Sequence, residues 1–199
     1  MDQPLSTGGV LWRMLGAWAD LRGSMRAELD REPSEGRLLF FAMFAGLIWF
    51  LGQAAVLAYG PLAPTLTGDE FTGRVAWEFI TSVLFVPLFY YVLAAIGGTL
   101  ARAMGGSGSW RDSRAAFFWA ALVAAPAMLG AKLLALLLAG LPGPVVGSVE
   151  MLGKVAFAWT TAHCFAEAHG FGSAWKVLAV VAGLPVALIG AVYVLGMIL

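Results

Sequence analysis

Four charged side chains lie within long apolar stretches, where their types and spacing could support chemistry. They are Glu78, Lys132, Glu150 and Lys154. An ionisable group in an apolar stretch is a functional candidate, because burying a charge in a membrane is costly. Glu150 and Lys154 stand four residues apart with the acid first, the favoured order for a helical ion pair. Lys132 could pair with Glu78 on another helix. Three interpretations remain open: interfacial ion pairs with snorkelling lysines, a pore mouth or substrate vestibule, and a catalytic carboxylate.

A second, weaker candidate group follows near the end of another apolar stretch and contains His163, Glu167 and His169. His163 and Glu167 share a helix face because they are four residues apart, and His169 falls in the glycine-rich turn that follows. Imidazole and carboxylate can bind divalent metals, but the spacing matches neither HExxH nor a four-ligand structural site. We therefore predict no metal. A hydrogen-bonded His–Glu pair at a helix end and a proton or ligand relay remain as alternatives.

Other signatures of catalysis do not emerge from the sequence. The lone cysteine, Cys164, excludes an intramolecular disulfide framework. The glycine-rich run at residues 105–109 lacks the lysine of a phosphate-binding P-loop. No nucleophile–base pair, haem-ligand pattern or nucleotide motif is recognisable, so we predict a protein that is not an enzyme and uses no cofactor.

The composition identifies the environment in which these side chains must work. Hydrophobic residues make up 60% of the 199 residues and charged residues only 12%, whereas soluble domains run at about 45–50% and roughly 25%. The 12 basic and 12 acidic residues cancel, so no basic excess indicates nucleic acid as a partner. The sequence predicts an integral membrane protein in contact with the lipid bilayer.

Five apolar stretches are long enough to cross a bilayer, which needs about 20 residues in a helix. Lipid offers no hydrogen-bond partners to the backbone, so these stretches should be helices rather than strands. We predict an all-α bundle of five transmembrane helices in a domain covering residues 38–199. The expected spans are about 38–59, 75–97, 115–141, 149–168 and 174–199.

The positions of the basic residues predict an orientation. Nine lie in the N-terminal tail and in the second and fourth loops, whereas the first loop has only Arg74. Because cytoplasmic loops are enriched in Lys and Arg, we predict a multi-pass protein of the inner (plasma) membrane, with a cytoplasmic N-terminus and a periplasmic C-terminus.

The segment before the first span, residues 1–37, has apolar residues at helical spacing and is predicted to form an amphipathic helix. Such a helix could pack against the cytoplasmic face of the bundle, lie in the membrane surface, or fill a groove of a partner. The residues of the apolar stripe are Val10, Leu11, Met14, Leu15, Trp18, Leu21, Met25 and Leu29.

Small residues and prolines mark the predicted spans. Gly183, Ala187 and Ala191 form a four-residue repeat that would let two helices approach closely, either within the bundle or against a second copy or partner. Pro87, Pro126 and Pro185 lie in mid-span, where each frees a backbone carbonyl and favours a kink. Mid-span prolines can indicate the moving halves of a transporter, or helices whose neighbours satisfy the freed groups.

The run from Ser113 to Pro126 reads Ser-Arg-Ala-Ala-Phe-Phe-Trp-Ala-Ala-Leu-Val-Ala-Ala-Pro and follows the glycine-rich loop. With the polar N-terminal segment and five closely spaced spans, this layout resembles bacterial members of the Yip (Ypt-interacting protein) family over about residues 35–199. Eukaryotic members carry Asp-Leu-Tyr-Gly-Pro before the first span, whereas the Tyr-Gly-Pro at residues 59–61 follows that span. No functional residue of the family is therefore carried over. The resemblance implies a non-enzymatic membrane protein that binds or organises other membrane components.

Two functions remain as hypotheses. The first is an accessory, scaffold or assembly partner of other membrane components, which would contact other membrane proteins or a second copy of itself. The alternative is a small-solute or ion transporter or channel that uses Glu78, Lys132 and Lys154.

Overall fold

The computed structural model describes residues 9–61, 63–181 and 183, and within them the secondary structure is helical, with no strands. Short 3-10 turns follow α1 and α3, a π-helical segment joins α4 to α5, and residues 174–181 are again helical. The α-helices are α1 (Val10–Gly16), α2 (Leu21–Leu29), α3 (Glu35–Tyr59), α4 (Gly68–Ile80), α5 (Val86–Ala103), α6 (Trp110–Leu137) and α7 (Gly143–Ala168).

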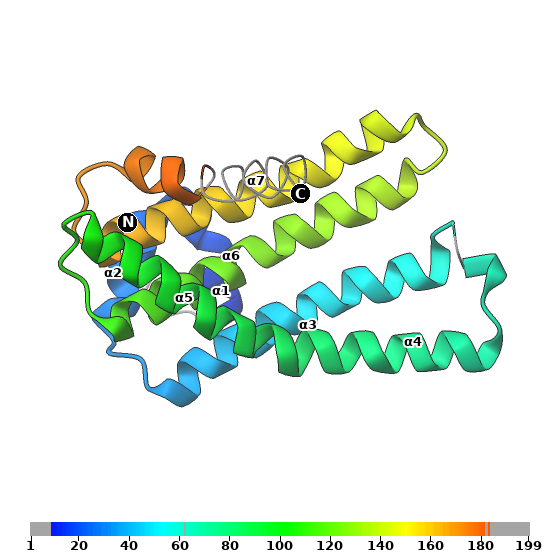
Figure 1. Cartoon of the computed structure of the whole chain (residues 1–199), viewed down its shortest axis with the longest axis horizontal. Helices are drawn as coiled ribbons and strands as arrows, with labels where there is room; N and C mark the ends of the chain where they lie inside the picture. The colour runs from blue at the N-terminus through cyan, green and yellow to red at the C-terminus, as the bar shows by residue number, and fades with distance from the viewer. Residues whose placement is uncertain (1–8, 62, 182, 184–199) are drawn as a thin grey trace, which may run out of the picture.

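The long helices form two hairpins that are close at one end of the molecule and diverge toward the other (Figure 1). One hairpin is α3 with α4 and α5, and the other is α6 with α7. We call the end where α3 and α6 begin and α5 and α7 end the capped end, because α1 and α2 pack there against α6 and α7. The opposite end, where α3 and α6 end, is called the open end.

Three helical stretches of the described chain are long and apolar enough to cross a membrane. They are α3, the continuous 36-residue stretch from α4 to α5, and α6. They contain the first two predicted spans and most of the third. The fourth predicted span falls within α7, which is 26 residues long and packs along α6. A helix begins at residue 174 as expected, but Ala187, Ala191 and most of the fifth span lie outside the described residues.

The N-terminal segment differs from the single amphipathic helix that we predicted. Asp20 adopts an extended backbone conformation between α1 and α2, and its carboxylate accepts a hydrogen bond from the Gly23 N–H at 2.9 Å. This is a helix N-cap, which starts α2 as a separate helix. The segment packs against the bundle, which is the first of the three alternatives. Of the apolar stripe, Met14, Leu21 and Met25 are buried, whereas Leu11, Leu15 and Trp18 remain exposed.

Helix α6 forms the centre of the capped end. Every residue from 115 to 125 is buried, because α1, α2, α3, α5 and α7 all contact this helix. Pro126 lies inside α6 without ending it. The Trp18 indole N–H donates to the Val123 carbonyl at 3.2 Å, next to the Leu122 carbonyl, which Pro126 leaves without its helical N–H donor. A neighbouring segment thus supplies a donor beside this proline.

The π-helical segment Thr81–Phe85 lies directly before Val86 and Pro87. A proline has no N–H to donate to the preceding turn, and a π-bulge is a common local adjustment inside a helix. Gly46 of α3 packs on this bulge so closely that a Cβ there would collide with the Ser82 carbonyl oxygen. The absence of a side chain at Gly46 therefore lets α3 approach the bulge.

Candidate functional site

The structure brings together three members of the first predicted cluster at the open end. Lys132 of α6 and two charged residues of α7 line a cavity of about 120 Å³ with an aromatic residue of α3. Glu78 is not among the residues that line this cavity. The lining residues are Trp49, Met128, Lys132, Glu150, Gly153 and Lys154.

The Lys132 ammonium contacts α3 rather than the predicted carboxylate. Its Nζ donates to Gln53 Oε1 at 2.5 Å and lies 4.9 Å from the centroid of the Trp49 ring, a cation–π contact. The alkyl chain passes over Gly52, where a Cβ would come within 3.1 Å of Lys132 Cδ. The sequence analysis missed Gln53 as the partner of Lys132. Gln53 is uncharged and lies 79 residues away in the sequence, so nothing in the pattern of charges indicated this contact.

Neither of the ion pairs expected in this cluster is formed. The six ion pairs found among the described residues do not include Lys132, Glu78, Glu150 or Lys154. The spacing of Glu150 and Lys154 permits a helical pair, but such exposed pairs are worth only about 0.3–0.5 kcal/mol. The cavity is therefore lined by charged groups that form no ion pair with one another.

The structure separates the second predicted group, and the expected His163–Glu167 pair is wrong. Glu167 instead accepts hydrogen bonds from Arg22 Nε at 2.8 Å and Arg26 Nε at 2.6 Å. His163 Nδ1 lies 3.0 Å from the Trp159 carbonyl oxygen, one turn earlier in α7. Two guanidinium groups form stronger, charge-assisted hydrogen bonds to the carboxylate than a neutral imidazole could.

His169 is buried between the glycine-rich loop and the start of α6. Its Nε2 lies 3.0 Å from Ser113 Oγ, and its ring stacks on Phe165 with an interplanar angle of 4°. A Cβ at Gly106 or Gly108 would come within 3.0 Å of the imidazole. Burial lowers the pKa of His169 from its ordinary value, and the charge of Arg102 acts in the same direction. His163, Glu167 and His169 thus have separate partners, and the described residues contain no group of three or more side chains placed to hold a metal.

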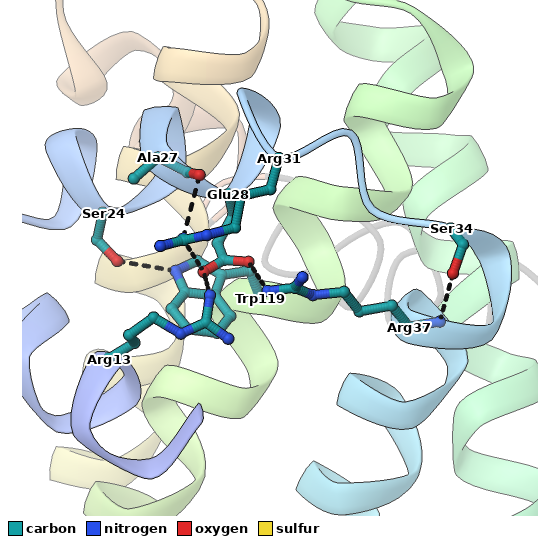
Figure 2. A network of polar contacts seen from close by, with 8 residues as sticks. All are labelled: Arg13, Ser24, Ala27, Glu28, Arg31, Ser34, Arg37 and Trp119. Atoms are coloured by element: carbon teal, nitrogen blue, oxygen red, sulfur yellow. Dashed lines mark hydrogen bonds and ion pairs between the residues drawn. The ribbon is translucent and has the colours of Figure 1, made fainter. Parts of the chain in front are cut away.

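A polar network that the sequence analysis did not anticipate lies under the N-terminal segment (Figure 2). Its centre is Glu28 of α2, which is 1% exposed. The carboxylate accepts hydrogen bonds from Arg31 at 2.8 Å and Arg37 at 3.1 Å, and it also pairs with Arg13. These arginines come from α1, from the residues after α2 and from the first turns of α3. One carboxylate therefore ties three segments together.

Trp119 of α6 packs against this network and contacts Ser24 and Arg13. Its indole N–H donates to Ser24 Oγ at 3.0 Å, and the Arg13 guanidinium lies 5.7 Å from the centroid of the ring. Burial lowers the pKa of Arg13 from its ordinary value, and the charge of Glu28 offsets part of that effect. The amphipathic pattern places Glu28 on the polar face, so the only sequence signal for the network was the spacing of Glu28 and Arg31.

Further arginines fasten the loops of the capped end. Arg22 also donates to the carbonyl oxygens of Phe171 and Gly172 at 2.8 and 3.2 Å. Arg111 donates to the Pro33 carbonyl at 3.0 Å. The basic residues that suggested an orientation therefore also hold the N-terminal segment and the loops on the bundle.

Comparison with known proteins bears on this arrangement, because residues 23–196 match the family model described as the Yip1 domain. The chain belongs to this family. No curated protein and no solved structure matches it. Membership of the Yip family, expected from the third span and the layout of the chain, is thereby confirmed, and the Yip1 domain places the protein in a membrane.

The Yip1 domain includes most of what the structure brings together. The match begins inside α2, so it contains Glu28, Glu167 and the Lys132 cavity. Arg13 and Trp18 precede it. The N-terminal segment therefore includes residues on both sides of the start of the Yip1 match.

Proposed function

We propose that this Yip1-domain protein is a non-enzymatic accessory, scaffold or assembly partner of other membrane components. The observation that carries the proposal is the way the N-terminal segment is held. Glu28 and Glu167 bind five arginines between them and fix α1 and α2 to the bundle. The polar groups face inward, whereas Leu11, Trp12 and Leu15 remain more than half exposed on the outer side of α1.

A rigidly held apolar face suits recognition of another membrane component. Fixing a segment in advance removes the cost of ordering it on binding, and aromatic residues such as Trp dominate binding energy at interfaces. The Trp12 side chain is 76% exposed. We propose that this face of α1 contacts another membrane protein or a second copy of the chain.

Photocrosslinking in native membranes tests this proposal. A photoreactive phenylalanine derivative at Trp12 should capture a protein adduct, detected as a shifted band and identified by mass spectrometry. Leu137, which is 82% exposed at the open end, is the matched control and should crosslink to lipid. Recovery of lipid adducts alone at both positions, or of a free monomer alone in native purification, would contradict the proposal.

The same proposal includes an orientation in the inner (plasma) membrane, with the capped end and the N-terminus in the cytoplasm. The basic residues support it, because the capped end contains nine of them and the first loop contains only Arg74. With Cys164 replaced by Ser, an impermeant maleimide should label an Asp69→Cys variant in intact cells and leave Asp30→Cys unlabelled. The reverse pattern would overturn the orientation.

A second candidate function, a small-solute or ion transporter or channel, is favoured by the cavity that Lys132, Glu150 and Lys154 line. Flux through reconstituted vesicles should then be lost in Lys132→Gln and retained in Glu78→Gln, since Glu78 does not line the cavity. Equal flux for Lys132→Gln and the wild-type protein would remove this candidate.

A further inference from the structure

The cavity at the open end has the size of an ion or a small headgroup. Its volume of about 120 Å³ corresponds to roughly four water molecules in the liquid. Pockets for organic ligands usually start at about 300 Å³. Two glycines shape the site because they have no side chain. Gly52 makes room for the alkyl chain of Lys132, and Gly153 lets α7 approach Met128 of α6.

The residues that line the cavity carry an excess of one positive charge. Lys132 and Lys154 are cationic and Glu150 is anionic. None of them belongs to an ion pair found in the described part of the chain. Lys132 donates to the neutral amide of Gln53 and lies over the face of Trp49, while the carboxylates of Glu150 and Glu78 act on it from beyond ion-pair distance. A half-buried ammonium in this position attracts an anion, since charges interact more strongly where water is scarce.

The depth of the cavity matches the headgroup region of a bilayer. Lys132 lies five residues before the end of α6 at Leu137, which is about 7.5 Å along a helix axis. The headgroup layers add about 5–7 Å on each side of the hydrocarbon core. A membrane surface near the end of α6 would therefore place lipid phosphates close to the level of Lys132.

We propose that this cavity binds a singly charged phosphate group, held by Lys132 and Lys154 and supplied either by an anionic phospholipid or by inorganic phosphate. One such group neutralises the excess charge. Gln53 Oε1 accepts a hydrogen bond from Lys132 Nζ, which holds the ammonium in place with two further donor hydrogens for a phosphate oxygen. Glu150 lowers the affinity, because its carboxylate faces the same cavity. The inference does not depend on the proposed scaffold role, since binding to the purified protein requires neither a partner nor flux.

The experiment uses the purified full chain in detergent. Native mass spectrometry compares binding of phosphatidylglycerol with that of diacylglycerol, the matched lipid without a phosphate, and calorimetry measures inorganic phosphate. We expect phosphatidylglycerol to bind in preference to diacylglycerol. Lys132→Gln and Lys154→Gln should each weaken phosphate-dependent binding by roughly tenfold or more, as expected for loss of a charge-assisted contact. Glu150→Gln should tighten it, and the control Lys176→Gln at the capped end should leave it unchanged.

The lysine variants are expected to weaken phosphate-dependent binding and the glutamate variant to strengthen it, so a general loss of folding cannot produce the expected pattern. Lys154 and Glu150 are exposed, so their variants report on the site even if Lys132→Gln fails to fold. Binding of phosphatidylglycerol that follows this pattern identifies the lipid as the source. The same pattern with inorganic phosphate alone identifies the free ion. Equal binding of diacylglycerol and phosphatidylglycerol with no response to inorganic phosphate, unchanged affinity in both lysine variants, or weaker binding in Glu150→Gln would overturn the proposal.

Discussion

The capped end and the open end of the bundle use charge in opposite ways. At the capped end, Glu28 and Glu167 are enclosed by arginines from distant segments. At the open end, Lys132, Glu150 and Lys154 surround a cavity without pairing. Buried charges need partners, so the first arrangement holds the protein together. Charges that remain unneutralised around a cavity are available to a ligand.

The two ends also differ in packing, because the capped end is densely packed and the open end is largely exposed. Helix α6 is buried on all sides from residue 115 to 125, whereas Leu133, Leu134 and Leu137 of the same helix are exposed. Helix α4, at the open end, has no buried residue. Exposed apolar surface of this extent suits lipid or another membrane protein. The comparison indicates that stability resides mainly at the capped end, and the following variants test it.

The largest effect is expected for Glu28→Gln. The substitution leaves three guanidinium groups without their shared carboxylate, and breaking a buried ion pair costs about 3–5 kcal/mol. Thermal unfolding in detergent should show a large decrease in Tm, and limited proteolysis should cut residues 9–34 faster. Glu150→Gln is the matched change at the open end and should alter Tm little. Equal Tm losses for both variants would break the comparison.

A smaller loss of stability is expected for Gly46→Ala. The new Cβ collides with the backbone at Ser82, and overpacking of this kind costs about 1–3 kcal/mol. Gly130→Ala in α6 has open space around it and should stabilise the helix by about 0.5–1 kcal/mol. Denaturant or thermal unfolding of the two variants should therefore shift in opposite directions. A shift in the same direction would show that the close contact between α3 and the π-bulge is not maintained.

Trp18→Phe tests the attachment of the N-terminal segment to α6. It removes the donor to the Val123 carbonyl and keeps most of the aromatic contact, so a loss of about 1 kcal/mol is expected. Hydrogen exchange near Pro126 should increase along with the decrease in Tm. Unchanged exchange there would mean that the carbonyl has another partner in solution.

The smallest effect is a pH dependence at His169. Because burial lowers its pKa in the folded state, the unfolded chain binds the proton more readily. The stabilisation from neutral His169 is complete at pH values above the pKa of histidine in the unfolded chain, about 6.5. It is lost as the pH falls from that value through the lower pKa of the folded state. Tm measured from pH 8 to 5 should fall more steeply for the wild type than for His169→Gln. Parallel curves would contradict this assignment.

The sequence predicted much of the fold but little of the side-chain pairing. The first three predicted spans coincide largely with the three helical stretches that could cross a membrane, because their signal is a continuous apolar run that does not depend on the rest of the fold. Helix α6 begins before the predicted start at residue 115, since the capping box of Ser109 and Asp112 extends it into polar sequence. The break at Asp20 was missed because a uniform apolar stripe hides a local N-cap.

The pairing errors share one physical cause. His163 and Glu167 were joined because residues four apart share a helix face, yet Arg22 and Arg26 reach Glu167 from more than 140 residues away. The same holds for Lys132 and Gln53, which are 79 residues apart. Helical spacing identifies which side chains can meet on one helix, and it contains no information about which other helix lies opposite.

The sequence by itself determined that the chain is a helical membrane protein, because hydropathy and helix length are local properties, and its match to the Yip1 domain shows the family. Only the tertiary structure decided that the N-terminal segment packs on the bundle, that Glu28 and Glu167 bind its arginines, and that Lys132 and Lys154 line a shared cavity. Those contacts depend on how α1, α2, α3, α6 and α7 pack, and packing is set by the whole chain together.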